Sequence, residues 1–290
     1  MPVEFEAKFI NIDINEIKKK LIQNGAKLEH KPLKFFRIVF SRCNTKTQLK
    51  GFVRARDEGN KVTLTSKIYP EGKEKYPEEY EVSINEDFNT GVNFLKSIGI
   101  DEKAYQESVR EKWYHPLVHE ITIDIIPGLP IYMEIDCTSE QNLDKMIKIL
   151  ELNDNNKRFG AYAKTYKEYY GIEEDVINEK TTSLSFNNIK NEITPTKNLK
   201  LFNDMCILNA ELDKYYNNDN MNEFYNKYSE IYNKYILKNN MERSLIKKNK
   251  KQSKKTSKKT SKKTSKKTSK KQSKKTTKKQ LKNKQKTIKK

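Results

Sequence analysis

The strongest constraint on the fold of this 290-residue chain is a regular alternation of charged and apolar side chains at its N-terminus. Glu4, Glu6 and Lys8 are separated by single apolar residues, and Phe9 continues the pattern. Successive side chains of a β-strand point to opposite faces, so every second residue shares a face at a spacing of about 6.7 Å. The segment therefore predicts a strand with three charges on one face, although a solvated face explains a single such segment equally well.

The same alternation returns in six further segments between residues 54 and 136. Their charged positions are Arg54, Arg56, Lys67, Glu79, Glu81, Arg110, Lys112, Asp124, Glu134 and Asp136. One polar strand face is ordinary, but seven in succession predict a sheet closed on itself with its charged faces turned inward. An open sheet of this kind would leave the hydrogen-bonding groups of its edge strands unpaired.

Such an interior contains seven acidic and six basic side chains. Charges removed from water are destabilising unless they are paired or bind a ligand, so the set indicates a binding site. Clustered Lys and Arg suit phosphate oxygens, and clustered carboxylates suit a hard divalent cation such as Mg²⁺ or Mn²⁺. A metal-bound substrate with several phosphates satisfies both groups together.

The ordered motifs EFEAK, FVRAR, LTSK, EEYEV, VREKW, TIDII and YMEID resemble those of the CYTH superfamily, the triphosphate tunnel metalloenzymes. The resemblance covers residues 1–171. It implies an α+β fold, an eight-stranded antiparallel β tunnel with flanking helices, which binds a triphosphate with divalent metal and cleaves a phosphoanhydride bond. This chain departs from the usual Lys-x-Arg order at Arg110 and Lys112, and it has Asp136 where the family usually has Glu.

The resemblance also implies a role for each inward charge. The implied metal ligands are Glu4, Glu6, Asp124, Glu134 and Asp136. The implied phosphate-binding residues are Lys8, Arg54, Arg56, Lys67, Arg110 and Lys112. In catalysis, Glu81 would help to hold metal or orient water, while Arg54, Arg56 and Lys67 would stabilise charge that develops on the transferred phosphoryl group.

Three functions remain open on this tunnel. A triphosphatase that hydrolyses inorganic, nucleotide or other organic triphosphates needs only these groups, and an RNA 5′-triphosphatase is one variant of it. A class IV-like adenylate cyclase also needs a nucleoside pocket, which no residue set specifies. A non-catalytic polyphosphate- or nucleotide-binding module would gain from losing its carboxylates, and the chain keeps them. We therefore predict a divalent-metal-dependent triphosphatase.

The basic character of the chain comes from its C-terminal end. The whole chain has 59 basic and 39 acidic residues, but residues 247–290 contain 23 lysines and no acid. This SKKT-repeat tail lacks the apolar residues of a core, so we expect it to be disordered and to bind nucleic acid or another polyanion. With no signal-peptide pattern, no long apolar run and only three scattered cysteines, the default is an intracellular protein, cytoplasmic or nuclear, without a membrane segment. No oligomeric state follows from these features.

Turn and capping signals divide the chain into three regions. These are the tunnel domain at 1–171, a linker with a helical segment at 172–246, and the tail at 247–290. Expected helices cover 13–24, 88–98, 139–152, 159–170, 199–216 and 222–237, with turns at 57–60 and 127–130 and a linker at 172–196. We expect structural or surface roles for His30, His115, His119, Trp113 and Lys164. The Tyr-rich helical segment is expected to form a helical hairpin that packs on itself or on the tunnel, and the alternative is a helix that binds a partner.

Overall fold

A strongly curved, mainly antiparallel sheet organises the protein in a computed structural model that describes residues 5–41, 50–69, 77–238 and 241. Its order is β5-β4-β3-β2-β6-β7-β8-β1-β9, and β10 pairs in parallel with β6. The long strands are β1 (Phe5–Phe9), β2 (Lys27–Ser41), β3 (Lys50–Asp57), β4 (Val62–Tyr69), β5 (Glu78–Ile84), β6 (Glu102–Tyr114), β7 (Glu120–Ile125) and β8 (Tyr132–Cys137). The two short ones are β9 (Lys157–Arg158) and β10 (Ser183–Leu184).

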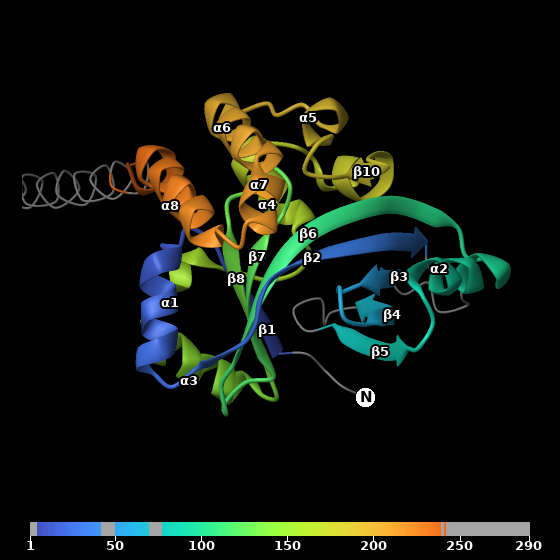
Figure 1. The fold of residues 1–290 in the computed structure, drawn as a ribbon, viewed down its shortest axis with the longest axis horizontal. Helices are drawn as coiled ribbons and strands as arrows, with labels where there is room; N and C mark the ends of the chain where they lie inside the picture. The colour runs from blue at the N-terminus through green and yellow to red at the C-terminus, as the bar shows by residue number, and fades with distance from the viewer. Residues whose placement is uncertain (1–4, 42–49, 70–76, 239–240, 242–290) are drawn as a thin grey trace, which may run out of the picture. The chain divides into compact units, whose positions relative to one another are not determined.

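The predicted antiparallel tunnel with flanking helices is confirmed in this curled form. Figure 1 shows β2 and β6 arching over β3, β4 and β5, so the inner faces of the strands enclose a common space. The path of hydrogen-bonded strands has two ends, β5 and β9, which do not pair with each other within the described residues. Side chains of the interior, rather than backbone bonds, connect the two sides of the curl.

Seven of the long strands carry the alternating charges, whereas β2 does not show this pattern. Its sequence around FFRIVF is apolar on both faces except for Arg37, so a search for alternating charge does not find it. In the structure β2 joins β3 to β6 and completes the set of eight long strands. Register shifts near Leu28, His30 and Leu33 make its first half irregular.

Helices cover the outside of the sheet where the sequence predicts them. They are α1 (Ile14–Gln23), α2 (Phe88–Ser97), α3 (Glu140–Ile149) and α4 (Ala163–Tyr170), with a 3-10 turn η1 (Asp154–Asn156). Asp13 caps α1 by accepting hydrogen bonds from the amides of Asn15 and Glu16, and Ser139 caps α3 in the same way. The helix predicted from residue 159 begins only at Ala163. Within the described part of the chain, no helix has both the length and the apolar character to cross a bilayer.

The C-terminal segment packs on the tunnel rather than apart from it. It contains η2 (Val176–Lys180), α5 (Ile189–Glu192), α6 (Leu199–Ala210), α7 (Leu212–Asn217), α8 (Met221–Ile231) and η3 (Tyr232–Leu237). Where the sequence predicts a linker, Ile177, Leu184 and Ile189 are buried in the same core as the tunnel. The hydroxyl of Tyr228 donates to the backbone oxygen of Ile131 before β8 at 3.3 Å. The segment therefore packs on the tunnel, which is one of the two arrangements expected from the sequence.

A buried carboxylate joins the sheet, α1 and α8. Glu111 faces outward on β6 and is 2% exposed. Its Oε2 lies 2.6 Å from Nζ of Lys18 and 3.5 Å from the hydroxyl of Tyr225, and its Oε1 accepts from Nε1 of Trp113 at 2.7 Å. Trp113 is consequently a core residue, as predicted. This contact fixes the outer face of the strand whose inner face carries Arg110.

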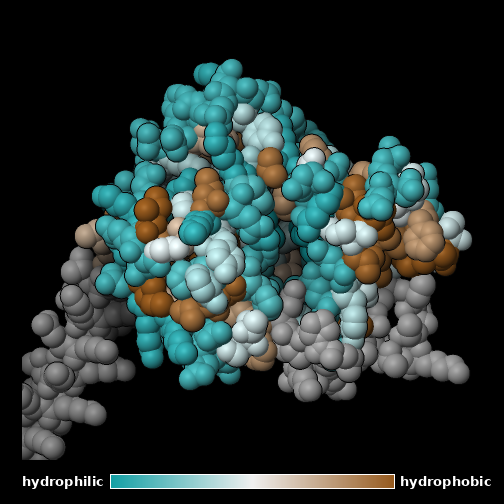
Figure 2. Space-filling model, turned by 60° about the horizontal axis from the view of Figure 1, so that its bottom comes forward, coloured by the Kyte–Doolittle hydropathy of each residue, from teal (hydrophilic) through white to brown (hydrophobic). Residues whose placement is uncertain are grey.

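The outer surface is mostly hydrophilic, with some exposed hydrophobic residues. A small second core of Phe40, Ala55, Val92 and Leu95 lies between α2 and the sheet. Figure 2 shows hydrophobic residues on both sides of the view, and those toward its right side lie where Figure 1 has α2 and β5. Both elements bear exposed apolar side chains.

Candidate functional site

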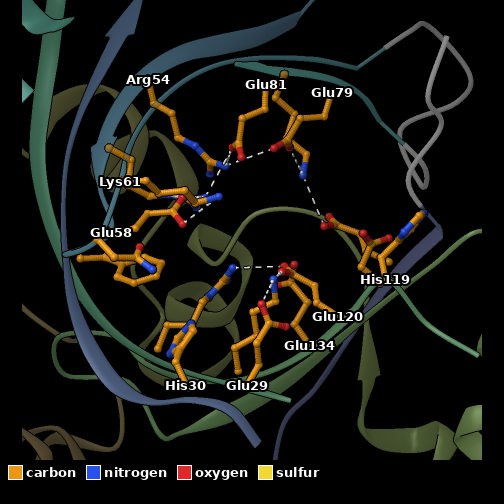
Figure 3. Close-up of a pocket in the computed structure, with 18 residues that line it drawn as sticks. Glu29, His30, Arg54, Glu58, Lys61, Glu79, Glu81, His119, Glu120 and Glu134 are labelled. Atoms are coloured by element: carbon orange, nitrogen blue, oxygen red, sulfur yellow. Dashed lines mark hydrogen bonds and ion pairs between the residues drawn. The ribbon is translucent and has the colours of Figure 1, made fainter. Parts of the chain in front are cut away.

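Charged side chains from all eight long strands line a cavity of about 440 Å³ inside the curled sheet. The lining contains six Lys or Arg side chains, eight Asp or Glu side chains, two histidines, Asn60 and Phe35. Figure 3 shows the labelled side chains directed toward a central opening, with Arg54, Glu79 and Glu81 across from Glu120 and Glu134. The cavity is therefore polar and of nearly balanced charge.

Arg54 of β3 connects to two carboxylates of β5. Its Nη2 lies 3.1 Å from Oε1 of Glu79 and 3.4 Å from Oε2 of Glu81. The hydroxyl of Thr65 accepts from Nε of Arg54 and donates to Glu81 at 2.8 Å. Burial favours the neutral form of Glu79, but the charges of Arg54 and Lys67 outweigh it and lower the pKa of this carboxyl.

Two lysines connect the opposite sides of the curl. Nζ of Lys67 on β4 lies 2.9 Å from Glu79 on β5 and 3.3 Å from Glu6 on β1. Nζ of Lys8 on β1 lies 3.3 Å from Glu6 and 3.1 Å from Glu134 on β8. Burial opposes the charge on Lys8, but Glu134 and Glu6 outweigh it and raise the pKa of Lys8. Burial likewise opposes the charge on Glu134, yet Lys8 and other nearby cations lower its pKa.

Arg56 stands beside Phe35, whose ring lines the cavity. Its guanidinium carbon lies 5.4 Å from the ring centre of Phe35, and its Nε lies 2.8 Å from Oε1 of Glu58. Burial and the neighbouring charge of Arg54 lower the pKa of Arg56 to about 10. An additional anion beside Arg56 would therefore be stabilising.

On β6, Arg110 and Lys112 share a carboxylate that the sequence analysis did not select. Arg110 holds Asp124 through two bonds, of 2.7 Å from Nε and 2.9 Å from Nη2. Nη1 of Arg110 also reaches Glu120 at 3.4 Å, and Lys112 lies 3.2 Å from the other oxygen of Glu120. Opposing carboxylates hold the charged form of Arg110 and raise its pKa despite burial. Glu120 also stands directly opposite Asp136 in the sheet register.

Ten of the thirteen predicted inward charges line the cavity. Lys8 and Asp124 are not in the lining but contact residues that are. Asp124 is 1% exposed beneath Arg110 and pairs in register with Tyr132, so the β7 residue directly opposite Asp136 is Glu120. Glu4 lies outside the described residues, as do Cys43 and the tail at 247–290.

Several lining residues escaped the sequence analysis. Phe35, Glu58 and Glu120 belong to this group, as do Glu29, Asn60 and Lys61. Glu120 continues the alternation of Thr122 and Asp124, so one further step along that strand would have found it. His30 and His119 also line the cavity, in contrast to the surface or structural roles predicted for them. His115 is buried and Lys164 is exposed, which agrees with the roles predicted for these two residues.

The carboxylates of β1 and β8 have the chemistry of a divalent-cation site. Glu6 and Asp136 are directly opposite in register, and Glu134 is opposite Lys8. Within the part of the chain that the structure describes, no group of three or more His, Cys, Asp or Glu converges as a complete metal cage. Mg²⁺ usually takes one or two carboxylates together with water and substrate phosphates, rather than a cage built only of protein. The donor set therefore fits such an ion as a partner of a phosphorylated ligand.

No protein-family model matches the chain, and no curated protein matches it. Several solved structures are similar to it. A conserved hypothetical protein of Pyrococcus furiosus is 20% identical with a TM-score of 0.45, and the match covers 55% of this chain and 97% of that one. A "putative adenylate cyclase" of Vibrio parahaemolyticus is 12% identical with a TM-score of 0.46, covering 56% and 96%. A "putative adenylyl cyclase" of Hippeastrum, described as having a dominant triphosphatase activity, is 14% identical with a TM-score of 0.38, covering 58% and 94%.

Identities of 20% or less and TM-scores below 0.5 relate these proteins to the chain without deciding what it does. The function has to be argued from the side chains of the cavity.

Proposed function

We propose that the protein is a divalent-metal-dependent triphosphatase that hydrolyses a phosphoanhydride bond within this cavity. One observation carries the proposal: the cavity places ion pairs, rather than isolated charges, around a space open to a ligand. Arg54 with Glu79 and Lys67 with Glu6 are examples. A triphosphate that enters together with a divalent cation supplies a new anion for each base and a new cation for each carboxylate.

The residues divide into two chemical roles under this proposal. Arg54, Arg56 and Lys67 bind phosphate oxygens and stabilise the charge that develops as the terminal phosphoryl group departs. Glu6 and Glu134 hold the cation, which when bound would neutralise phosphate charge and assist the attack of water. Lys8, Arg110 and Lys112 complete the phosphate contacts, and Asp124 and Asp136 complete the carboxylate set.

Glu81 is the proposed partner of the attacking water. Its two ion-pair contacts are long, at 3.4 Å from Arg54 and 3.5 Å from Arg56. Its side chain is 30% exposed, against 12% for Glu79. A carboxylate that is accessible and loosely paired is suited to accept a hydrogen bond from water.

A substrate panel with Mg²⁺ and with Mn²⁺ tests the proposal. It compares tripolyphosphate, ATP, thiamine triphosphate and 5′-triphosphate RNA, with products identified by chromatography. We expect orthophosphate release by the native protein and its loss in Arg54→Gln, with Arg158→Gln as a control because Arg158 pairs with Glu168 outside the cavity. Cyclic AMP with pyrophosphate would instead identify a cyclase, and no turnover of any substrate would favour a binding module.

The tail adds a separate proposal about partners. Residues 247–290, with 23 lysines and no acid, would bind nucleic acid or another polyanion in a salt-dependent manner. The basis of this proposal is composition alone. It is independent of the chemistry in the cavity.

A further inference from the structure

Glu58 is a carboxylate of the cavity to which the proposed function assigns no role. It lies in the turn between β3 and β4, two residues after Arg56, and its side chain is 10% exposed. The next three residues of the turn, 59–61, are exposed, so Glu58 stands where the cavity meets solvent. Figure 3 shows it beside Lys61. A carboxylate that is buried to this extent needs partners that compensate for its lost hydration.

Arg56 is the main partner of Glu58. Nε of Arg56 donates to Oε1 of Glu58 at 2.8 Å, and Nη2 of Arg56 donates to the same oxygen. The other oxygen, Oε2, lies 3.4 Å from Nζ of Lys61. Glu58 thus neutralises two bases that line the cavity, one through each of its carboxylate oxygens.

This contact occupies an edge of Arg56 that suits a phosphate. A guanidinium binds a phosphate bidentately when two neighbouring N–H groups each meet a separate oxygen. Glu58 gives Nε and Nη2 a single oxygen to share, so a phosphate on this edge would offer one more acceptor and a larger negative charge. The other edge, Nη1 with Nη2, already has a carboxylate, because Nη2 donates to Glu81 at 3.5 Å.

Arg56 also requires an anion at all times. It is directly opposite Arg37 in the sheet register, and the charges of Arg54 and Arg110 act against its own. Like charges that face each other across a sheet are destabilising. If Glu58 withdraws, another anion has to take its place beside Arg56.

Glu58 can withdraw without disturbing the sheet. The carboxylate partners of Arg54 and Lys67 lie on strands β1 and β5. Glu58 lies instead in a turn, where its amide donates to the backbone oxygen of Lys61 at 2.9 Å. A rotation of the side chain therefore ends its contacts with Arg56 and Lys61 while the strand pairing stays intact.

We propose that Glu58 occupies Arg56 in the unliganded protein as an internal substitute for phosphate, and that a phosphate of the ligand takes its place. Glu58 is then a positioning residue that sets the affinity of the cavity. It keeps Arg56 paired in the absence of ligand, and its displacement reduces the net gain on binding. The inference rests on the proposed function, because it assumes that Arg56 binds phosphate.

Calorimetric titration with sodium tripolyphosphate, in buffer with EDTA, tests the exchange apart from catalysis. Glu58→Gln keeps the shape of the side chain and removes its charge, so we expect about tenfold tighter binding, the change typical of one hydrogen bond to a charged group. Arg56→Gln should bind more weakly. Adding Glu58→Gln to Arg56→Gln should change the affinity by less than about twofold, because the guanidinium for which Glu58 competes is gone.

Glu168→Gln is the matched control, because it removes the same charge from the surface pair with Arg158. It should bind tripolyphosphate as the native protein does. A second readout is the Michaelis constant for tripolyphosphate with Mg²⁺, which should fall by a similar factor in Glu58→Gln and serves where the metal-free affinity is too weak to titrate. A role in the fold alone would leave this constant unchanged or raise it.

Three results would overturn the inference. Unchanged or weaker binding by Glu58→Gln would mean that Glu58 stays on Arg56 and orients it. Equal tightening with and without Arg56 would mean that only the net charge of the cavity matters. Native affinity in Arg56→Gln would remove Arg56 from the phosphate site, while the proposed function would still stand on Arg54.

The proposed function fails as well only if the native protein neither binds tripolyphosphate nor hydrolyses any triphosphate. Circular dichroism establishes that each variant is folded. Glu58→Ser replaces Glu58→Gln if the latter does not fold, because serine is readily accommodated in turns.

Discussion

The carboxylate of Glu111 offers a quantitative test of how burial strengthens an ion pair on the outer face of the sheet. Glu111 is outward-facing on β6, between Arg110 and Lys112 of the cavity, and it is 2% exposed. It accepts from Lys18 at 2.6 Å and from Trp113 at 2.7 Å. We predict that Glu111→Gln destabilises the protein far more than an exposed substitution of the same kind.

The expected magnitude follows from these contacts. A hydrogen bond to a charged group contributes about 1.5–3 kcal/mol. The amide of Gln retains one oxygen that can accept one of the two bonds. The side chain of Lys18 is 22% exposed, so its ammonium group remains partly hydrated in the variant. We therefore expect a loss of about 2–3 kcal/mol in the free energy of unfolding, less than the ~3–5 kcal/mol for breaking a fully buried pair. The melting temperature should fall by roughly 4–12 °C for a unit of this size.

Glu102→Gln is the matched control because Glu102 also lies on β6 and also has a lysine at 2.6 Å, Lys96. Its side chain is 38% exposed, so its loss should stay below about 1 kcal/mol. Urea unfolding followed by circular dichroism measures both variants, and the fluorescence of Trp113, the single tryptophan of the chain, gives a second probe. Equal midpoints for the two variants would refute the argument that burial of Glu111 makes its contact strong.

Three further outcomes follow from the cavity and the tail. Glu6→Gln should stay folded and lose turnover by about 100-fold or more, since it removes one charge from the carboxylate set; near-normal rates at saturating Mn²⁺ would contradict the metal role. The pKa of Glu79 is lowered in the folded protein, so its stabilising contribution is present above about pH 4.3 and is lost as the pH falls through the folded-state value. The difference in unfolding free energy between the native protein and Glu79→Gln should accordingly shrink between about pH 6 and about pH 3, and a constant difference would exclude this linkage. Truncation after residue 246 should abolish salt-dependent binding of RNA while small triphosphates are still hydrolysed; retained RNA affinity would move the nucleic-acid surface away from the tail.

The sequence alone determined the strand faces and the starts of the helices that have a side-chain cap, because both depend on local geometry. The charges at Arg54, Arg56, Glu79 and Glu81 alternate with apolar residues, and a two-residue period places such side chains on one face whatever the partner strand is. Asp13 likewise caps α1 through bonds to residues two and three positions away. Signals of this kind depend only on residues that are close together in the sequence.

Only the tertiary structure decided which charges meet, because strand pairing joins residues far apart in the sequence. Lys67 contacts Glu6 across 61 positions, and nothing near either residue specifies that contact. The apolar run of β2 hides an inward-facing Arg37 whose neighbours, Arg56 and Gln106, come from two other strands. Register across β7 and β8 likewise set Glu120, and not Asp124, opposite Asp136. A one-residue shift in pairing would exchange the faces of a whole strand, so the site depends on a register that no local pattern encodes.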